Sequence, residues 1–133
     1  MIKNKLFLFS VTICILFAAC KSSIKPEQLY GKWKYLKIEN TDVRSTNNVT
    51  SEQLEAESPY IQFSKNDSML IIWGGRILSH GSYKLDGNNI RVKEILPGGK
   101  TRDFPFIISQ LDDKNLIFET TGDDGARVTA VKE

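Results

Sequence analysis

The sequence predicts an all-β protein: an antiparallel up-and-down β-barrel of about eight strands, with a short helical turn before the first strand. Three observations lead to this fold class. Apolar or alternating runs recur about every ten residues, with Gly, Asn and Asp between them, which is typical of an all-β meander, barrel or sandwich. Most of these runs have one apolar face, as the strands of a closed antiparallel barrel do. No run is followed by a helix long enough for a parallel βαβ unit.

The expected strands follow one another along the chain with turn residues between them. Gly74-Gly75 is a hairpin dipeptide, and Asp86-Gly87-Asn88 and Pro97-Gly98-Gly99 are further turns. Clusters containing Asp separate the last three runs. They are expected to be turns, because an Asp side chain can hydrogen-bond to the backbone near it in a turn. In chain order the expected strands are 31–38, 60–64, 68–73, 76–85, 89–96, 102–111, 115–120 and 126–131.

Two segments do not fit the strand pattern. Residues 23–31 predict a short helical turn, with Pro26 at a tolerated first-turn position. Residues 40–58 are polar and poor in large hydrophobic side chains, and a brief helix can begin at Ser51. Loops of this length tend to be lids or binding loops, and a disordered surface loop is the alternative. The sequence leaves both readings open.

The alternation of side chains predicts which face of each strand is inside. The other face is mostly Lys, Arg, Gln, Asp and Thr. Residues 68–73 (SMLIIW) are apolar on both faces, so they are expected to lie under the long loop or against a partner. The residues expected inside are Trp33, Tyr35, Ile61, Phe63, Tyr83, Leu85, Ile90, Val92, Phe104, Phe106, Ile108, Leu116, Phe118, Val128 and Ala130.

The first 19 residues are typical of a secretory signal. Lys3 and Lys5 give a positive start, and residues 6–19 form an apolar run of 14 residues that ends in small side chains. A membrane-spanning helix needs about 20 such residues, so the run is too short to be one.

The end of this run, Phe17-Ala18-Ala19-Cys20, resembles the lipobox of bacterial lipoproteins, with Phe17 where Leu is commonest. The resemblance implies that the Cys20 thiol is lipidated with acyl chains such as palmitate, that Cys20 begins the mature chain, and that the lipid anchors it in a membrane. An ordinary signal peptide cut after Ala18 or Ala19 is the alternative. Residues 21–23 contain no aspartate, which resembles sorting to the outer membrane. They contain no acidic cluster either, which favours the periplasmic leaflet over the cell surface.

Composition excludes several function classes for the mature chain. Its 114 residues are enough for one domain, and they carry 16 basic and 16 acidic side chains, a balance that argues against nucleic-acid binding. Apart from Cys20 it has no thiol for a disulfide, a metal site or a nucleophile. His80 is the only histidine, and a lone histidine is more often structural than catalytic. We therefore expect no enzyme, no metal site and no cofactor.

Three motifs resemble bacterial lipocalin-like lipoproteins. Leu29-Tyr30-Gly31-Lys32-Trp33 is similar to the turn and Gly-x-Trp that open their first strand, and residues 80–92 (HGSYKLDGNNIRV) and 108–118 (ISQLDDKNLIF) are similar to later segments. The resemblance implies a signal at 1–19, a lipidated tether at 20–28 and a lipocalin-like barrel at 29–133. It also implies that Gly31 and Trp33 close one end of the barrel, where an arginine packs on the indole. Arg127 is the candidate for that arginine.

The function expected from this resemblance is non-enzymatic binding of a small hydrophobic ligand, or of an envelope protein, at the membrane. Seven bulky aromatics on the predicted inner face work against a roomy cavity. The alternative is therefore a filled barrel that serves as an accessory of an outer-membrane complex and takes no small ligand. The expected ligand contacts are Tyr35, Phe63, Tyr83, Phe106 and Phe118.

Overall fold

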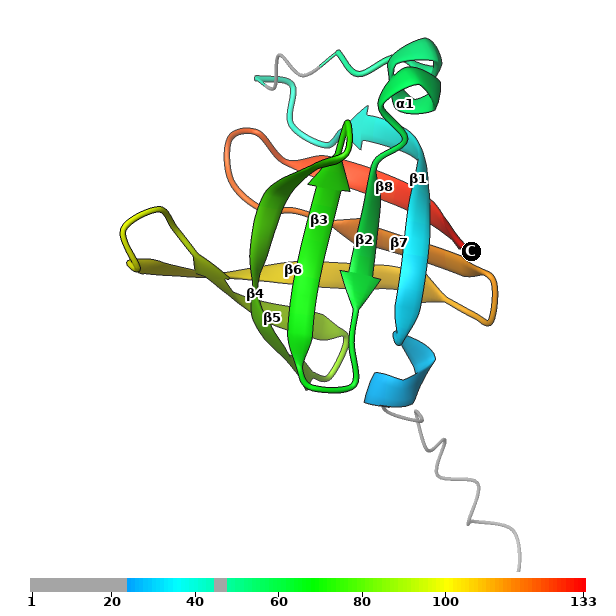
Figure 1. The fold of residues 1–133 in the computed structure, drawn as a ribbon. Helices are drawn as coiled ribbons and strands as arrows, with labels where there is room; N and C mark the ends of the chain where they lie inside the picture. Colours follow the sequence, from blue (N-terminus) through cyan, green and yellow to red (C-terminus); the bar gives the residue numbers. More distant parts are fainter. Residues whose placement is uncertain (1–23, 45–47) are drawn as a thin grey trace, which may run out of the picture.

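The computed structural model describes residues 24–44 and 48–133. Those residues form strands, one short α-helix and one 3₁₀ turn (Figure 1). The predicted signal at 1–19 and the predicted lipidation site Cys20 lie outside the described residues and stay predictions. The elements are η1 (Pro26–Gln28), β1 (Gly31–Asn40), α1 (Ser51–Glu57), β2 (Tyr60–Phe63), β3 (Ser68–Trp73), β4 (Arg76–Asp86), β5 (Asn89–Ile95), β6 (Thr101–Leu111), β7 (Asn115–Glu119) and β8 (Ala126–Lys132).

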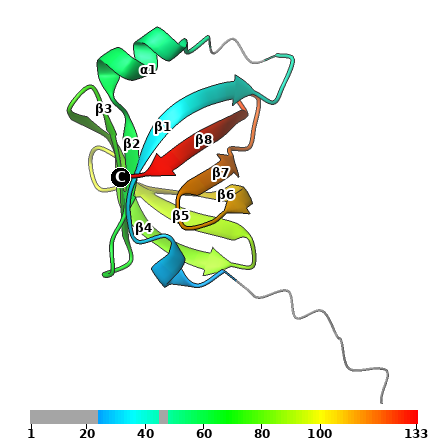
Figure 2. The same ribbon diagram turned by 90° about the vertical axis from the view of Figure 1, so that its right-hand side faces the viewer.

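The strands form one closed barrel in which each strand pairs antiparallel with the next and β8 pairs with β1. Pairs such as Trp33 with Lys132 and Tyr35 with Ala130 close the ring. The predicted fold class is confirmed. Figures 1 and 2 show η1 and α1 at opposite ends of the barrel. Because the whole ladder and its core lie within the described residues, this part of the chain has what a domain needs to fold alone.

The core is the inside of the barrel, and the alternation in the sequence predicts it well. In β5, for example, Ile90 and Val92 are buried while Arg91 and Lys93 are exposed. Leu85 and Phe104, also expected inside, are only partly buried against the core. The fully or almost fully buried side chains include Leu29, Trp33, Ile61, Phe63, Met69, Ile90, Val92, Leu116, Phe118 and Ala130.

The closed end of the barrel is built around Trp33. Leu29, at the end of the η1 turn, is completely buried, and its carbonyl accepts a 2.8 Å hydrogen bond from Trp33 Nε1. Lys132 Nζ lies 4.7 Å from the centre of the indole ring and donates a hydrogen bond to the Tyr30 carbonyl. A cation over an indole contributes about 0.5–2 kcal/mol. These contacts seal the end of the barrel at which the chain enters.

Lys132, and not Arg127, is the cation that packs on Trp33, so the role expected for Arg127 is corrected. Val128 and Ala130 point inward, and strand alternation therefore puts Arg127 on the outer wall. There its guanidinium donates two hydrogen bonds, of 2.9 and 2.7 Å, to Glu119 Oε1 on the neighbouring strand. The same alternation brings residue 132 to the inner side, at the closed end.

At the other end, here called the open end, helix α1 packs beside β1 and the β3–β4 turn. Thr50 and Gln53 form a capping box: Thr50 Oγ1 accepts from the Gln53 amide at 3.2 Å, and Gln53 Oε1 accepts from the Thr50 amide at 2.9 Å. Leu54 is the buried residue of the helix, and the Gly74 amide donates to the Glu57 carbonyl at 2.9 Å. The helix therefore begins at Ser51, as the sequence predicts.

The remaining described part of the 40–58 segment is tied to the β7–β8 loop. The Thr41 amide donates a 3.0 Å hydrogen bond to the Gly125 carbonyl. Arg44 Nη2 lies 3.0 Å from Asp42 and 3.1 Å from Asp123, on the exposed surface. Exposed ion pairs contribute only about 0–1 kcal/mol each. The hydrogen bond and the ion pair with Asp123 hold the two loops next to each other, and both loops border the open end of the barrel.

Candidate functional site

The five aromatics expected to contact a ligand are divided between the two halves of the barrel. Tyr35, Phe106 and Phe118 line a cavity of about 460 Å³ at the open end, here called the mouth cavity. Their rings touch one another: the Phe106 and Phe118 centroids are 4.8 Å apart, and those of Tyr35 and Phe118 are 6.2 Å apart. The three rings belong to the core, each at most 6% exposed, and their edges form part of the cavity wall.

Phe63 and Tyr83 do not line the mouth cavity. They pack on each other in the closed half, with ring centroids 5.0 Å apart and planes inclined at 69°. The Tyr83 hydroxyl donates a 3.3 Å hydrogen bond to the Ser64 carbonyl. Both side chains are almost completely buried, so their place in the structure is that of core residues.

Other residues of the mouth cavity were not singled out from the sequence. Trp73, the last residue of the doubly apolar run in β3, faces the cavity. Leu78 reaches the cavity rim because β4 carries an extra residue there: Ile71 pairs with Ser79 and Ile72 with Ile77, which leaves Leu78 unpaired. The full lining is Tyr35, Ile38, Val49, Ile71, Trp73, Leu78, Phe106, Phe118, Thr120, Asp124, Ala126 and Val128.

A second cavity of about 480 Å³ adjoins the mouth cavity and is here called the side cavity. It is bordered by the β5–β6 hairpin, which projects from the body of the barrel in Figure 1. Phe104 and Phe106, with ring centroids 5.3 Å apart, supply its aromatic surface. The two cavities share Ile71, Leu78, Phe106 and Thr120, so they are neighbours, and together they are here called the cleft.

A polar cluster lies on the wall of the side cavity. Ser79 Oγ donates a hydrogen bond to Glu94 Oε2, and Arg102 Nη2 lies 2.8 Å from Glu94 Oε1. Glu94 is 8% exposed, and it is the one charged residue that is buried among those the structure describes. The Arg102 side chain is 63% exposed, and its guanidinium lies 5.2 Å from the centre of the Phe104 ring.

Two tyrosine hydroxyls stay protonated at neutral pH. Burial raises the pKa of Tyr35 well above its ordinary value, and burial also raises the pKa of Tyr83 to about 12. The Tyr83 hydroxyl donates a hydrogen bond to the Ser64 carbonyl, whereas no hydrogen bond joins the Tyr35 hydroxyl to another described residue. Tyr35 therefore brings an unused donor to the lining of the mouth cavity.

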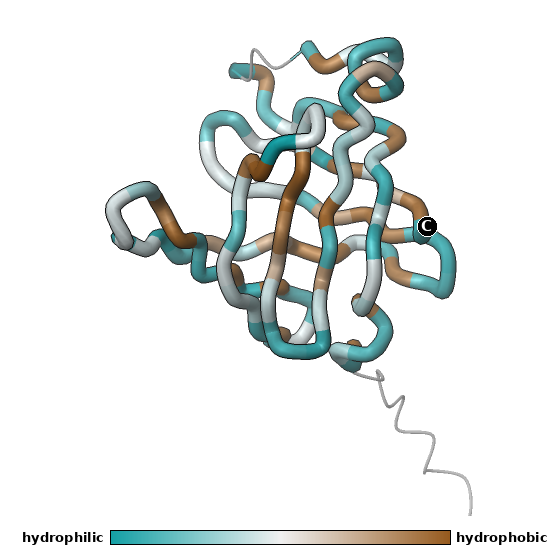
Figure 3. Tube along the Cα trace, in the orientation of Figure 1, coloured by the Kyte–Doolittle hydropathy of each residue, from teal (hydrophilic) through white to brown (hydrophobic). Residues whose placement is uncertain are grey.

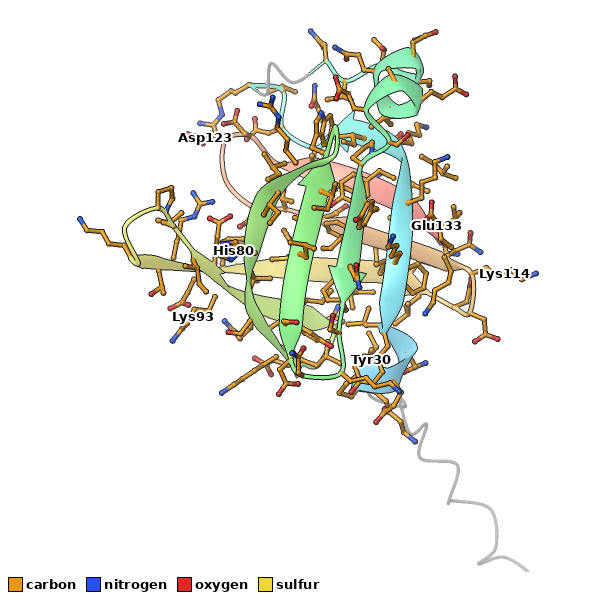
Figure 4. The ribbon with its side chains drawn as sticks, in the orientation of Figure 1. Tyr30, His80, Lys93, Lys114, Asp123 and Glu133 are labelled. Atoms are coloured by element: carbon orange, nitrogen blue, oxygen red, sulfur yellow. The ribbon has the colours of Figure 1, made fainter. Side chains whose placement is uncertain are left out.

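Residues with catalytic or metal-binding chemistry do not converge in the described part of the chain. His80 is exposed on the outer wall opposite Leu70, and Figure 4 shows it well apart from Asp123 and Lys114. Asp112 accepts hydrogen bonds from the backbone of Lys114 and Asn115, as a turn aspartate does, and these bonds lower its pKa. Residues 24–44 and 48–133 contain no group of three His, Cys, Asp or Glu that could hold a metal ion. No helix in those ranges has the length and apolar character needed to cross a membrane.

The comparisons with known proteins add no family. No protein-family model matches the chain, and no curated protein matches it. The closed eight-stranded antiparallel barrel is consistent with the lipocalin-like fold that the three sequence motifs resemble. A functional proposal for this chain therefore rests on its barrel and on the cleft at the open end.

Proposed function

We propose that this protein is a lipocalin-like binding protein, without enzymatic activity, that holds a small, largely apolar ligand in the mouth cavity. The observation that supports the proposal is the cavity itself, about 460 Å³ lined mainly by aromatic and aliphatic side chains. Cavities of roughly 300–1,000 Å³ with an apolar lining and a few polar groups are the usual form of small-ligand sites. Here the polar groups are Thr120, Asp124 and the Tyr35 hydroxyl.

The distribution of aromatics supports a binding role over a completely filled barrel. Trp33, Phe63 and Tyr83 fill the closed half, where packing gives stability. Tyr35, Phe106 and Phe118 line the cavity in the other half. The closed half of the barrel is thus filled, and the free space is the mouth cavity beside the largely buried Tyr35, Phe106 and Phe118.

The anchoring part of the proposal comes from the sequence. A lipid on Cys20 would tether the chain to the outer membrane, on its periplasmic side. The described chain enters the barrel through η1 at the closed end (Figure 1). An anchor on that side would leave the mouth cavity facing away from the membrane, where it can exchange ligand with the periplasm.

A cavity-filling substitution tests the ligand site. Ala126 is 8% exposed and lines the mouth cavity, so Ala126→Phe places a ring in the space that the ligand would take. We expect residues 21–133 to bind N-phenylnaphthylamine with a rise in probe emission, and Ala126→Phe to weaken this binding about tenfold or more, a loss of about 1.4 kcal/mol. Thr129→Phe, on the outer wall of the same strand, is the matched control and keeps the affinity. Equal affinities for all three proteins would place the probe elsewhere and reject the cavity as the site.

A second candidate function, docking of an envelope protein, is favoured by an exposed apolar surface. Such a surface was expected over residues 69–73, but Met69 and Ile71 are buried, and the exposed side chains are on the neighbouring strands. Ile77 is 61% exposed and pairs with the outward-facing Ile72, and Ile95, on β5, is 46% exposed. Figure 3 shows the hydrophobic colour along much of β3. This candidate takes precedence if the wild-type domain binds no apolar probe.

A further inference from the structure

Three polar side chains occupy positions where alternation otherwise places apolar residues, and two of them, Ser79 and Glu94, lie inside the barrel while Arg102 is 63% exposed at its edge. Ser79 pairs with the inward-facing Ile71, and Glu94 continues the buried series of β5. Arg102 pairs with Glu94 and lies at an inward position of β6. All three border the side cavity, within the cleft that continues into the mouth cavity. Their place on the inner wall, beside apolar surface, is that of a polar subsite.

The Glu94 carboxylate in this cluster has one oxygen that is not fully satisfied. Oε2 accepts the Ser79 hydroxyl, but Oε1 is buried and accepts no hydrogen bond from any described group. Arg102 Nη2 lies 2.8 Å from Oε1 and forms an ion pair with it, but makes no aligned hydrogen bond to it. Because Oε1 is inaccessible to solvent beside Arg102, an incoming N–H donor reaches it by displacing the exposed Arg102 side chain, and an aligned hydrogen bond there would be favourable.

The charges on the cleft favour a cation over an anion. The charged residues that line the two cavities are Glu94, Arg102 and Asp124, so carboxylates outnumber the guanidinium by two to one. Arg102 is also the most exposed member of the cluster and rests on the Phe104 ring, so water screens its charge more than that of Glu94. Because Arg102 pairs with Glu94, one carboxylate charge on the cleft is left over, and a positive head group would balance it.

We propose, on the basis of the binding function proposed above, that the ligand is an amphipathic amine. Its apolar body lies against Tyr35, Phe106 and Phe118 in the mouth cavity, and its ammonium group donates a hydrogen bond to Glu94 Oε1. An ammonium has three donors, so it can serve this oxygen and still contact water in the open cleft. Charge-assisted hydrogen bonds of this kind are about twice as strong as neutral ones.

A series of ligands with the same chain and different head groups tests the proposal on the wild-type domain. Dodecylamine, dodecyltrimethylammonium, dodecanol and dodecanoate, each below its micelle concentration, are used to displace N-phenylnaphthylamine from residues 21–133. We expect dodecylamine to bind about tenfold or more tightly than the other three. The trimethylammonium compound has the same charge but no N–H, so it separates hydrogen bonding from charge alone.

Variants then assign the preference to Glu94. Glu94→Gln keeps the shape of the side chain and removes its charge, and we expect it to abolish the preference for the amine while the affinity for dodecanol stays within about twofold. Glu119→Gln, which alters an acid paired with Arg127 on the outer wall, is the matched control and keeps the preference. Circular dichroism shows whether each variant is folded, and the wild-type series decides the question if Glu94→Gln is not.

The possible outcomes distinguish a failure of the amine site from a failure of the proposed binding function. Equal affinities for the amine and the trimethylammonium compound, or a preference that survives Glu94→Gln, would overturn the amine site and leave the apolar carrier intact. Tightest binding of dodecanoate would also overturn it, with Arg102 as the head-group residue. If neither the probe nor any dodecyl compound binds, the proposed function itself fails.

Discussion

Replacing Trp33 with alanine is expected to lower the free energy of unfolding by about 3–5 kcal/mol, the usual cost of truncating a fully buried tryptophan. Trp33 is 0% exposed, and three interactions meet on it: apolar packing, the hydrogen bond to Leu29 and the Lys132 cation. Small domains have only about 5–15 kcal/mol of stability in total. Urea unfolding followed by circular dichroism measures the loss.

Trp33→Phe separates the hydrogen bond from the packing. The phenyl ring keeps much of the apolar volume, but the Leu29 carbonyl loses the hydrogen bond that Trp33 Nε1 donates to it. We expect a smaller loss, about 1–3 kcal/mol, because a buried acceptor is left without a partner. A Trp33→Ala domain that unfolds within about 1 kcal/mol of the wild type would show that the closed end is not the stable base of the barrel.

Replacing Gly81 with alanine is expected to cost about 3 kcal/mol, at the upper end of the range for overpacked sites. A Cβ atom at Gly81 would lie 1.9 Å from the Lys93 carbonyl oxygen and 3.0 Å from Glu94 Cα. Both atoms belong to the backbone of β5, so no side-chain rotation can relieve the clash and the β4–β5 ladder must shift. The thermal unfolding midpoint measures the effect.

Ser82→Ala is the control for Gly81→Ala. Ser82 is the next residue of β4 and is exposed on the outer wall, so its replacement is expected to change stability by no more than about 0.5 kcal/mol. Because Glu94 pairs with Gly81, the Gly81 variant should also lose the polar subsite of the side cavity. Equal unfolding midpoints for the two variants would mean that β4 and β5 do not approach each other at Gly81 as closely as they do in the structure.

The strands were the most predictable part of the fold, because each carries its own local signal. Alternation identified the inner face of β5 at Ile90 and Val92, and the glycine pair at 74–75 marked the β3–β4 turn. The cap at Thr50 and the helix start at Ser51 are also local. Closure of the barrel was expected from the single apolar face of each strand and from the lipocalin-like resemblance, although no local pattern shows which residues of β1 and β8 meet.

The candidate site was less predictable, because it depends on how side chains are distributed along the barrel axis. Counting aromatics predicted little free space, and Tyr35, Phe106 and Phe118 are indeed at most 6% exposed; the cavity of about 460 Å³ beside them at the open end could not be read from the count. Leu78 reaches the cavity through an extra residue in β4 that alternation does not reveal. Glu94 is different, because it lies at an inward position of a strand that was already assigned. Lys132 lies one residue beyond the expected strand 126–131, at the next inward position, so extending the alternation would have found it.

The most direct test of the central claim, that the open end of the barrel holds a ligand, is native mass spectrometry of residues 21–133 purified without added lipid. The binding function predicts a second species, heavier by one small molecule, in the wild type. In Ala126→Phe this species should be lost, while Thr129→Phe retains it. The account would be contradicted if the wild-type domain is detected only at the mass of the protein alone, and if adding dodecylamine or dodecanol produces no heavier species. That result would favour docking of a protein on the outer wall.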